Sequence, residues 1–418
     1  MEIKKIYKLY SKHYLISTDT RDMRKNTLFF ALKGGRFNGN KFANEALKNG
    51  ARYAIIDEKE YKTSDKTILV DNVLETLQKL ASYHRIQLNA PILAITGSNG
   101  KTTTKELINC VLSEKYSTTA TAGNLNNHIG VPLTLLSMTP KTEIGIVEMG
   151  ANHQKEIEFL CSIAQPDYGY ITNFGKAHLE GFGGIEGVIK GKSELYSFLI
   201  EADKIVFVNP SDALQVEKTS HAKTISFAEN TAFIDANPFV KLSFNTQQIQ
   251  SNLVGDYNYT NIIAAITIGT YFKVEPLQIK EAIENYVPTN NRSQIIKKES
   301  NHIILDAYNA NPSSMKVALE NFSKIKKELK TVILGDMFEL GEESTKEHQE
   351  IVNLADSFYF TNTLYVGAHF YKADTKNKQF KTFKAMKNFI NTNPIKNESI
   401  LIKGSRGMQL ERILEFIG

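Results

Sequence analysis

The stretch PILAITGSNGKTTTKELI, Pro91 to Ile108, decides the fold of the surrounding chain. It opens with a short apolar run, Ile92 to Ile95, whose β-branched residues predict a buried strand. A turn follows, in which Gly97 and Gly100 allow backbone conformations that a Cβ atom would forbid. Beyond the turn, apolar residues between Lys105 and Ser113 recur at helical spacing. The stretch therefore predicts a strand, a glycine turn and a helix in succession.

A turn of this kind is suited to holding phosphate. Several backbone N–H groups point at one spot, in front of the positive end of the helix dipole. Lys101 adds a full positive charge, and the hydroxyl of Thr102 is a possible magnesium ligand. The usual Walker pattern would need a glycine where Ile95 stands. Because a strand precedes the turn and a helix follows it, a phosphate site is favoured over a solvated turn.

The composition is that of a globular protein with several domains. At 418 residues the chain is too long for one typical core, so two or three domains are expected. A hydrophobic content of 42% and a charged content of 23% argue against a disordered chain. No apolar run approaches the roughly 20 residues that a membrane helix needs, and the N-terminus lacks an apolar signal-peptide core. We therefore expect a protein without a membrane span.

Charge and cysteine content narrow the functional classes further. The two cysteines, Cys110 and Cys161, suggest a reducing compartment, and we expect a cytoplasmic protein. A net charge of +5 suits anionic small ligands. The sequence contains no concentrated run of basic residues with interleaved aromatic residues, so we expect no nucleic-acid partner.

The pattern of strands and helices divides the chain into three predicted α/β units. Residues 1–86 contain short strand-like runs such as TLFFAL and YAIID, and SYHRIQLNAP reads as a connector to the next unit. Residues 87–288 alternate buried parallel strands with helices, as a P-loop ATPase domain does. Residues 289–418 repeat the alternation in a second, Rossmann-like unit. Ligands of such sheets bind at the carboxyl ends of the strands.

Residues with useful chemistry follow several predicted strands. Glu148 ends the strand IGIVE, where it can hold magnesium or be a solvated strand end. His178 lies in ITNFGKAHLEGFGG, and the glycine-rich tail favours a functional loop over a structural histidine. Lys190 and Lys192 lie about 200° apart on a predicted helix, so they face opposite ways. Spacing alone does not decide which of the two lysines faces the site.

Two further loops carry polar side chains. Asp306 follows the strand HIIL and is placed to accept ribose hydroxyls or to hold a cation. The Asn-Pro pair after it would open a helix. GNLNNHIGVP, Gly123 to Pro132, is an amide-rich loop that would bond either a polar ligand or its own backbone.

These elements, in this order, resemble the Mur ligase family, the ATP-dependent amino-acid ligases of bacterial cell-wall precursor synthesis. The resemblance covers essentially the whole chain and rests on TGSNGKTTT, EMGANHQKEI, ITNFGKAHLEGFG, KGKSEL, GDYNYTNIIAA, NNRSQ and DAYNANPSSM. DTRDMRKNTLFFALKGGRFNGNKF, YNANPSSM, LGDMFELG and LIKGSRGM are similar to members that add D-Ala-D-Ala to a UDP-N-acetylmuramoyl tripeptide. The family often has Gly-Arg at Asn291-Arg292, His at Tyr257, and Asp-Gly-His at Asn38-Gly39-Asn40.

The resemblance implies a ligase that works through an acyl phosphate. ATP would phosphorylate the terminal carboxylate of the tripeptide, and the amine of D-Ala-D-Ala would attack the product. It further implies two magnesium ions, an N-terminal domain for the UDP end of the substrate, and a monomer. The protein's own task would be charge neutralisation and positioning.

Carried over residue by residue, the resemblance assigns roles to the candidates. The catalytic group would be Lys101, Glu148, His178 and Lys192. Magnesium would be held by Thr102 and Glu148 at one site, and by His178 and a carbamylated Lys192 at the other, since KSEL matches the family at Lys192. ATP would be bound by Gly97, Ser98, Asn99, Gly100, Lys101, Thr102, Thr103, Asn258, Asn261, Arg292 and Asp306. The substrates would be bound by Thr20, Arg21, Asn126, Asn127, Tyr308, Asn309, Asn311, Ser405 and Arg406.

Two other functions remain open on the sequence. A sister ligase would add a different amino acid to a related precursor. A P-loop ATPase that powers a partner would hydrolyse ATP without ligation. The separate first and third units argue for substrate capture, and hence for a ligase.

Overall fold

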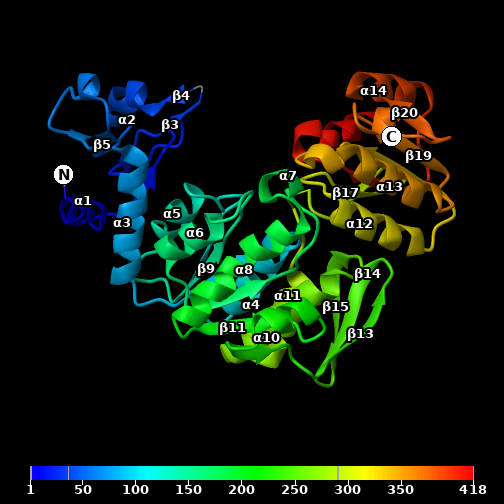
Figure 1. Cartoon of the computed structure of the whole chain (residues 1–418), viewed down its shortest axis with the longest axis horizontal. Coiled ribbons are helices and arrows are strands. Elements are labelled where there is room, and N and C mark those ends of the chain that lie inside the picture. The colour runs from blue at the N-terminus through cyan, green and yellow to red at the C-terminus, as the bar shows by residue number, and fades with distance from the viewer. Residues whose placement is uncertain (1, 36, 290, 418) are drawn as a thin grey trace.

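A computed structural model describes residues 2–35, 37–289 and 291–417 and folds into three α/β units along the chain (Figure 1). The N-terminal unit (blue) and the C-terminal unit (yellow to red) lie on either side of the central one. The predicted α/β class, with a parallel central sheet, is confirmed. Among the described residues we find no helix with the length and apolar character that crossing a membrane requires.

The N-terminal unit is a small parallel sheet with helices packed on it. Its strands lie in the order β1-β2-β5-β6, and a short hairpin, β3-β4, extends from it. The strands are β1 (Ile16–Ser17), β2 (Leu28–Phe30), β3 (Lys33–Gly34), β4 (Phe37–Asn38), β5 (Tyr53–Ile56) and β6 (Thr67–Leu69). The helices are α1 (Ile3–Tyr10), α2 (Ala43–Lys48) and α3 (Val73–Gln87).

Helix α3 corrects one expectation. The segment SYHRIQLNAP was interpreted as a connector, but its first six residues form the last part of α3. The helix starts where the Asn72 side chain accepts a hydrogen bond from the Glu75 N–H, and it buries Leu77, Leu80 and His84 along one face. That face packs against central helices α5 and α6, so α3 joins the first two units.

The central unit is built on six parallel strands in the order β12-β11-β10-β7-β9-β8. The strands are β7 (Ile92–Thr96), β8 (Thr118–Ala120), β9 (Ile144–Glu148), β10 (Tyr168–Ile171), β11 (Ile205–Val208) and β12 (Lys223–Ser226). The helices are α4 (Lys101–Ser113), α5 (Gly130–Leu135), α6 (Glu156–Ala164), α7 (Leu179–Phe182), α8 (Ile185–Glu201), α9 (Ala213–Lys218), α10 (Asn258–Tyr271) and α11 (Pro276–Asn285). Strand β7 lies between β10 and β9, which places the glycine turn in the middle of the sheet edge.

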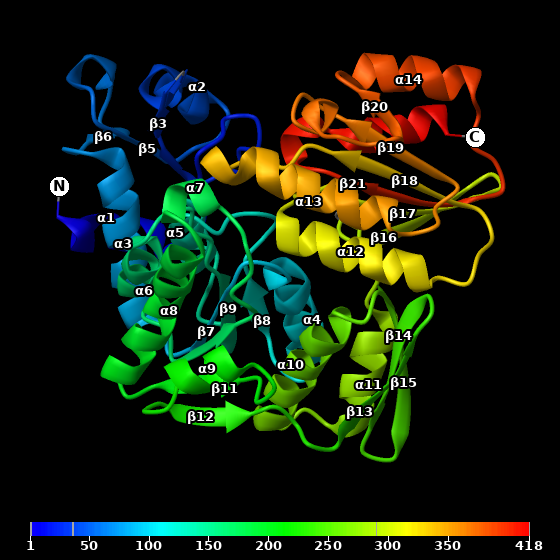
Figure 2. The ribbon, with the colours of Figure 1, turned by 45° about the vertical axis from the view of Figure 1, so that its right-hand side comes forward.

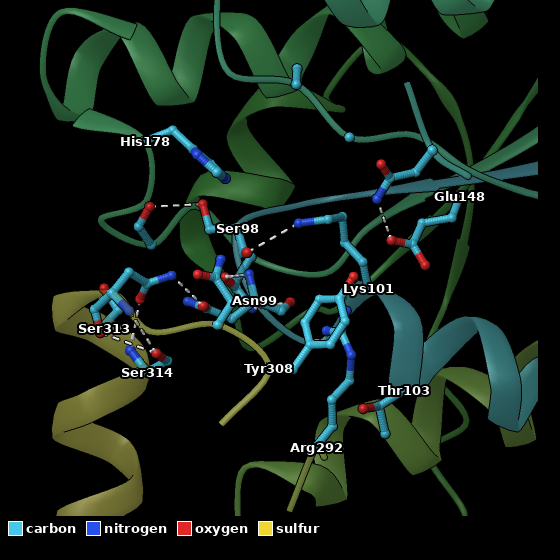
Figure 3. A pocket seen from close by; sticks show the side chains of 18 of the residues that line it. Ser98, Asn99, Lys101, Thr103, Glu148, His178, Arg292, Tyr308, Ser313 and Ser314 are labelled. Carbon is cyan, nitrogen blue, oxygen red and sulfur yellow. Dashed lines mark hydrogen bonds between the residues drawn. The ribbon is translucent and has the colours of Figure 1, made fainter. Parts of the chain in front are cut away.

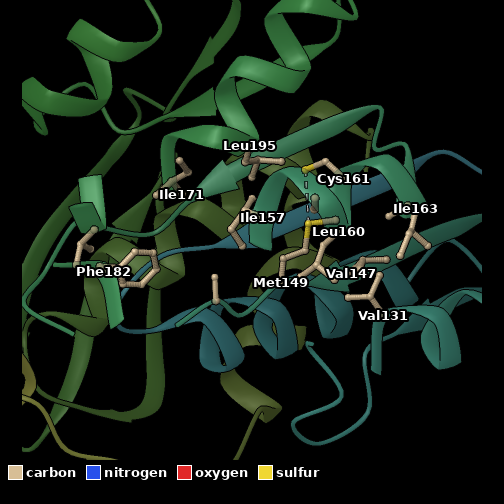
Figure 4. Close-up of a cluster of buried hydrophobic side chains, with 14 of the residues drawn as sticks. Val131, Val147, Met149, Ile157, Leu160, Cys161, Ile163, Ile171, Phe182 and Leu195 are labelled. Carbon is tan, nitrogen blue, oxygen red and sulfur yellow. Dashed lines mark hydrogen bonds between the residues drawn. The ribbon is translucent and has the colours of Figure 1, made fainter. Parts of the chain in front are cut away.

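Apolar side chains cover both faces of this sheet, as a parallel sheet requires. Figure 4 shows Ile157 and Leu160 of α6 and Leu195 of α8 gathered with Val147 and Ile171 of the sheet. On the other face, α4 and α10 pack together over a second cluster. The central sheet is therefore buried on both faces, and the loops at its carboxyl ends start from packed strands.

A three-stranded antiparallel sheet follows β12 and was not predicted. It consists of β13 (Thr231–Ala236), β14 (Phe239–Phe244) and β15 (Gln247–Val254), which cover α10 and α11 on one side (Figure 2). Buried and less buried residues alternate along β14, with Val240 and Leu242 facing the core. Period-two alternation is the signal that identifies such a strand.

The C-terminal unit has a mixed sheet in the order β16-β17-β21-β18-β19-β20, in which only β16 is antiparallel to its neighbour. The strands are β16 (Gln294–Lys298), β17 (Asn301–Asp306), β18 (Lys330–Gly335), β19 (Asn362–Val366), β20 (Lys378–Phe380) and β21 (Ser399–Lys403). The helices are α12 (Pro312–Lys324), α13 (Ser344–Asp356) and α14 (Phe383–Thr392). The last predicted helix, MQLERILEFI, is instead a 3₁₀ helix, Leu410–Phe416, whose buried Leu410 and Ile413 match a three-residue turn.

Candidate active site

A cavity of about 850 Å³ lies where the central strand ends face the C-terminal unit (Figure 3). It is lined by residues of both units, so neither unit alone forms it. The predicted site residues that line it are Ser98, Asn99, Gly100, Lys101, Thr103, Asn126, Asn127, Glu148, His178, Asn258, Asn261, Arg292, Asp306, Tyr308, Asn309 and Asn311.

The glycine turn, residues 97–102, forms a tight loop that only glycine permits at two positions. Gly97 has φ +137°, and a Cβ atom there would lie 2.0 Å from Thr172 Oγ1. Gly100 has φ +79°, and a Cβ atom there would lie 2.9 Å from Asn261 Oδ1. The Ser98 hydroxyl donates to Gly175 O at 2.7 Å, which ties the loop to the segment after β10. We call residues 97–102 the phosphate cradle.

Lys101 begins α4, four residues earlier than the apolar spacing predicted. Its Nζ donates to Gly97 O at 2.6 Å and to Ser98 O at 3.1 Å, so the ammonium group lies over the cradle. Burial lowers the pKa of Lys101 to about 8, with Glu148 opposing the shift and Arg292 adding to it. A phosphate at the N-terminus of α4 would offset that desolvation with negative charge.

Thr102 and Glu148 meet beneath the cradle. Thr102 Oγ1 donates to Glu148 Oε2 at 2.8 Å, and Asn126 Nδ2 donates to Glu148 Oε1 at 2.8 Å. Thr121 Oγ1 accepts from the Glu148 backbone N–H at 2.9 Å, which fixes the strand end. Two hydrogen bonds therefore orient the carboxylate, and a third fixes its backbone. A hydroxyl and a carboxylate side by side are oxygen ligands of the kind that Mg²⁺ prefers.

Lys192 is buried and Lys190 is exposed, so the helix turns Lys192 toward the interior. Lys192 Nζ donates to Ala151 O at 3.1 Å and lies 4.9 Å from the centre of the Phe182 ring. Burial lowers the pKa of Lys192 well below its usual value, and the charge of Lys101 adds to the shift. The lower pKa favours an uncharged amine, which is the nucleophilic form.

His178 reaches the C-terminal unit. It adopts a left-handed backbone conformation with φ +52°, and its Nδ1 contacts Glu339 Oε2. Because Nδ1 is turned to a carboxylate, Nε2 is the ring nitrogen on the far side. A carboxylate partner on one ring nitrogen is the usual arrangement of a histidine that binds metal through the other. Among residues 2–35, 37–289 and 291–417, no three His, Cys, Asp or Glu side chains gather as a metal cluster.

On the C-terminal side, Asp306 and Lys403 end the adjacent strands β17 and β21 in register. Lys403 Nζ donates to Asp306 Oδ2 at 2.5 Å, and the Ser293 N–H donates to Asp306 Oδ1 at 3.3 Å. The Tyr257 and Ser293 hydroxyls are 2.7 Å apart, which links the start of α10 to the same carboxylate. Burial, with the charge of Asp306, raises the pKa of Tyr257, so this hydroxyl stays protonated.

Two guanidinium groups lie near the Tyr308 ring. The Cζ of Arg292 is 3.9 Å and the Cζ of Arg406 is 5.2 Å from the ring centre. Arg406 Nη1 also donates to the Tyr308 hydroxyl at 3.2 Å. Figure 3 shows the Tyr308 ring against Arg292, below Lys101. The stack brings positive charge to the cavity from the C-terminal unit.

The side chains of three predicted site residues also accept hydrogen bonds from nearby backbone N–H groups. Asn127 Oδ1 accepts from the Gly130 N–H at 2.9 Å, and Asn309 Oδ1 accepts from the Ala310 N–H at 2.9 Å. Asn311 caps α12 through the Ser314 N–H, and its Nδ2 donates to Asn99 Oδ1 at 2.7 Å. Asn311 therefore joins the C-terminal unit directly to the cradle.

The predicted site residues that do not line the cavity are Gly97, Thr102, Lys192, Thr20, Arg21, Ser405 and Arg406. Thr20 donates to Glu45, and Arg21 pairs with Asp19 with 87% of its side chain exposed, both on the N-terminal unit. Ser405 is buried, and its hydroxyl accepts from the Phe338 N–H at 3.0 Å. Arg406 reaches the site only through Tyr308. The structure does not bring Thr20 and Arg21 together with the other candidates.

Sequence reasoning missed several residues that shape the site. Asn173 Oδ1 accepts from the Asn99 N–H at 3.2 Å, and its Nδ2 donates to Asn99 O at 3.1 Å, so it holds the middle of the cradle. Lys403 partners Asp306, and Asn126 was assigned to a substrate and not to Glu148. A polar residue at the end of an apolar strand, as in SILIK, was the available signal for Lys403.

Comparison with known proteins agrees with this geometry. Residues 12–85 match the Mur ligase family catalytic domain, residues 95–269 the Mur ligase middle domain, and residues 291–406 the Mur ligase glutamate ligase domain. The UDP-N-acetylmuramoyl-tripeptide–D-alanyl-D-alanine ligase of Bacillus subtilis (strain 168) is 33% identical over 96% of this chain and 92% of that protein. The ligase of the same name from Escherichia coli (strain K12) is 32% identical over the same shares.

Solved structures of Mur ligases are also similar to this chain. MurF from Acinetobacter baumannii superposes with a TM-score of 0.84 at 32% identity, over 96% of this chain and 92% of that one. MurF ligase from Thermotoga maritima, solved in complex with ADP, superposes with a TM-score of 0.82 at 27% identity, over 96% of each chain. The predicted family is confirmed: this chain belongs to the Mur ligase family.

Proposed function

We propose that this chain is an ATP-dependent ligase that joins D-Ala-D-Ala to the terminal carboxylate of a UDP-N-acetylmuramoyl tripeptide. The observation that carries the proposal is one cavity that combines a phosphate cradle with the Asp306–Lys403 pair of a second unit. The relatives that match over nearly the whole chain are named for this ligation. The reaction serves peptidoglycan precursor synthesis, and we place it in the cytoplasm.

In this proposal the cradle and Lys101 hold the phosphates of ATP while Asp306 accepts the ribose hydroxyls. Asn258 and Asn261 lie near the adenine, and Arg292 lies over the phosphates. A carboxylate oxygen of the tripeptide attacks the γ-phosphorus, an O–P bond forms, and ADP leaves. The amine of D-Ala-D-Ala then attacks the acyl carbon, loses a proton, and expels phosphate. The protein's contribution is positioning and charge neutralisation.

Two magnesium sites are part of the proposal. Bound magnesium would neutralise the transferring phosphate, with Thr102 and Glu148 at one site and His178 and Lys192 at the other. Lys192 would act as its carbamate, which forms when the uncharged amine adds to CO₂ and loses a proton. The lowered pKa of Lys192 supports this step, because only the uncharged amine adds to CO₂.

We assign the three units separate tasks. Residues 1–86 hold the UDP end of the substrate, with Thr20 and Arg21 near the uridine, and residues 87–288 bind ATP. Residues 289–418 bring Tyr308, Ser405 and Arg406 to the incoming dipeptide. Asn126 and Asn127 would contact the UDP-sugar part of the substrate. We also propose that the chain acts as a monomer.

Phosphate release measured with each acceptor in turn tests the proposal. We expect release only when the UDP-tripeptide and D-Ala-D-Ala are both present. A sister ligase would release phosphate with a different amine and not with D-Ala-D-Ala. Release that needs neither acceptor would identify an ATPase without ligation and would overturn the proposal.

A further inference from the structure

One short segment of the central unit crosses to the C-terminal unit beside the cavity. In residues 175–180, the Lys176 N–H donates to Ser313 Oγ at 2.8 Å, and Lys176 Nζ donates to Glu347 Oε1 at 2.6 Å. The Glu180 N–H donates to Glu339 O at 3.3 Å. The segment therefore contacts α12, α13 and the loop after β18. His178 lies in the middle of it.

The side chains of the Lys176–Glu347 pair differ in exposure. Only 3% of the Glu347 side chain is exposed, while 43% of the Lys176 side chain is. A buried carboxylate needs a partner, because leaving it unpaired carries the full cost of desolvation. The charges of Glu350 and Glu343, like that of Glu347, raise the pKa of Lys176. The charge of Lys176 is therefore matched to an acidic surface on the other unit.

The pair lies at one end of α12, and a second set of contacts lies at the other. There the Asp256 N–H donates to Asn321 Oδ1 at 2.8 Å, and Lys324 Nζ pairs with Asp256 at 2.7 Å. A helix of 13 residues is about 20 Å long, so the two sets are well separated. The Asp256 contacts adjoin Tyr257 and Ser293, near the connection between the units. The Lys176 contacts thus hold the end of α12 that lies away from the connection.

We propose that Lys176 and Glu347 are positioning residues, whose ion pair holds segment 175–180 and the C-terminal unit together around the cavity. Neither residue lines the cavity, so each acts through its neighbours. Gly175 and His178 do line it, on either side of Lys176. The effect on turnover rests on the proposed function, whereas the effect on the contact between the units does not.

Hydrogen exchange tests the contact without any substrate. Glu347→Gln removes the charge from the C-terminal unit and leaves the sequence of segment 175–180 unchanged. We expect the amides of Lys176 and Glu180, which both donate across the interface, to exchange about fivefold faster. The amide of Asp256 donates across the same interface at the other end of α12, and its rate should stay the same. Unchanged rates at Lys176 and Glu180 would overturn the proposal.

A charge swap tests the consequence for turnover. Lys176→Glu should lower kcat/KM for ATP about tenfold, and adding Glu347→Lys should restore most of the loss. The matched control is the exposed pair Lys316–Glu320 within α12, whose swap should leave turnover unchanged. A double variant no better than Lys176→Glu alone, with the same melting temperature as the wild type, would refute the pairing. Faster exchange in Glu347→Gln, with no acceptor-dependent phosphate release from the wild type, would refute only the proposed function.

Discussion

Burial and phosphate binding have opposite effects on the charge of Lys101. The cradle buries its ammonium group and lowers its pKa to about 8, while a bound phosphate would need that group charged. The charge is therefore a cost to the free protein and a benefit to the complex, which is typical of a binding residue. Its hydrogen bonds to two cradle carbonyls are short and local, so the fold does not depend on them.

We expect Lys101→Ala to reduce turnover by at least about a hundredfold, because the main positive charge at the phosphates is lost. Its melting temperature should stay within a few degrees of the wild type. The measurement is phosphate release with both acceptors, beside thermal unfolding. A well-folded Lys101→Ala protein with normal turnover would show that the cradle does not bind the reacting phosphate.

Lys192 and Lys190 form an internal comparison two residues apart. Lys192→Ala should lose activity, and short-chain carboxylates should restore part of it, because they supply the oxygens of the missing carbamate. Lys190→Ala should behave like the wild type, since its side chain is exposed. Steady-state turnover with and without added acetate distinguishes the two. The opposite pattern would mean that the site lies on the other face of α8.

At the level of elements, α3 carries a titratable group into the apolar junction of two units. His84 is buried between Tyr7, Tyr10 and Tyr14, and its Nε2 lies 3.0 Å from Met138 O. Burial lowers the pKa of His84 below the value of a free histidine. The unfolded chain therefore binds this proton more readily than the folded chain does.

Folding stability should consequently fall as the pH drops through about 6.5, the usual histidine range, and level off below the lowered pKa. His348 of α13, whose pKa burial also lowers, contributes to the same slope. We expect His84→Gln to melt with a shallower dependence on pH between about 7.5 and 5.5. Thermal unfolding of both proteins across this range is the measurement. If the melting temperatures of the two proteins changed in parallel with pH, the pH dependence would come from groups other than His84.

The elements that the sequence predicted best are those with local signals. Strand β7, the cradle and α4 follow each other within one stretch, and Gly97 and Gly100 mark the turn by their own chemistry. The β13–β15 sheet was not predicted, because β13 is mostly exposed and its residues, TAFIDA, do not alternate strictly between apolar and polar. The last turns of α3 were missed because their polar residues, such as Arg85, were read as a connector.

The site could be predicted only in part, for a similar reason. Asp306 and Glu148 are visible as acids that end apolar strands, but their partners come from distant positions. Lys403 reaches Asp306 from 97 residues away, and Asn126 reaches Glu148 from 22. Such pairs depend on strand order and loop placement, which no local pattern encodes. The inward direction of Lys192, left open by spacing, is settled only by the packing of α8.

At the scale of the whole molecule, both apolar and polar contacts join the three units. The N-terminal unit joins the central one through the apolar face of α3, and the Tyr10 hydroxyl donates to Leu136 O at 2.8 Å. The C-terminal unit belongs to the same apolar cluster, and it is also joined to the central unit by polar pairs such as Asn99–Asn311 and Lys176–Glu347. One partner of each of these two pairs is partly exposed, so water can replace the hydrogen bonds between them. We therefore expect this junction to open more easily than the N-terminal one.

The last prediction concerns motion at that junction. The acyl carbon, the γ-phosphate and the attacking amine must come within roughly 3–3.5 Å of one another, and the groups that position them belong to two units. In the structure both sets line one cavity. We expect the free protein in solution to sample wider arrangements by bending in residues 287–293, a stretch that includes Pro288 and whose residue 290 lies outside those described. Closure would also expel water, which an acyl phosphate must avoid.

Small-angle scattering should therefore show a smaller radius of gyration when a non-hydrolysable ATP analogue and the UDP-tripeptide are both bound. ADP alone is the control and should compact the protein less, because it lacks the γ-phosphate and the substrate that bridge the units. An unchanged radius in a protein shown to be saturated would mean that the site is preformed, or that the hinge lies elsewhere.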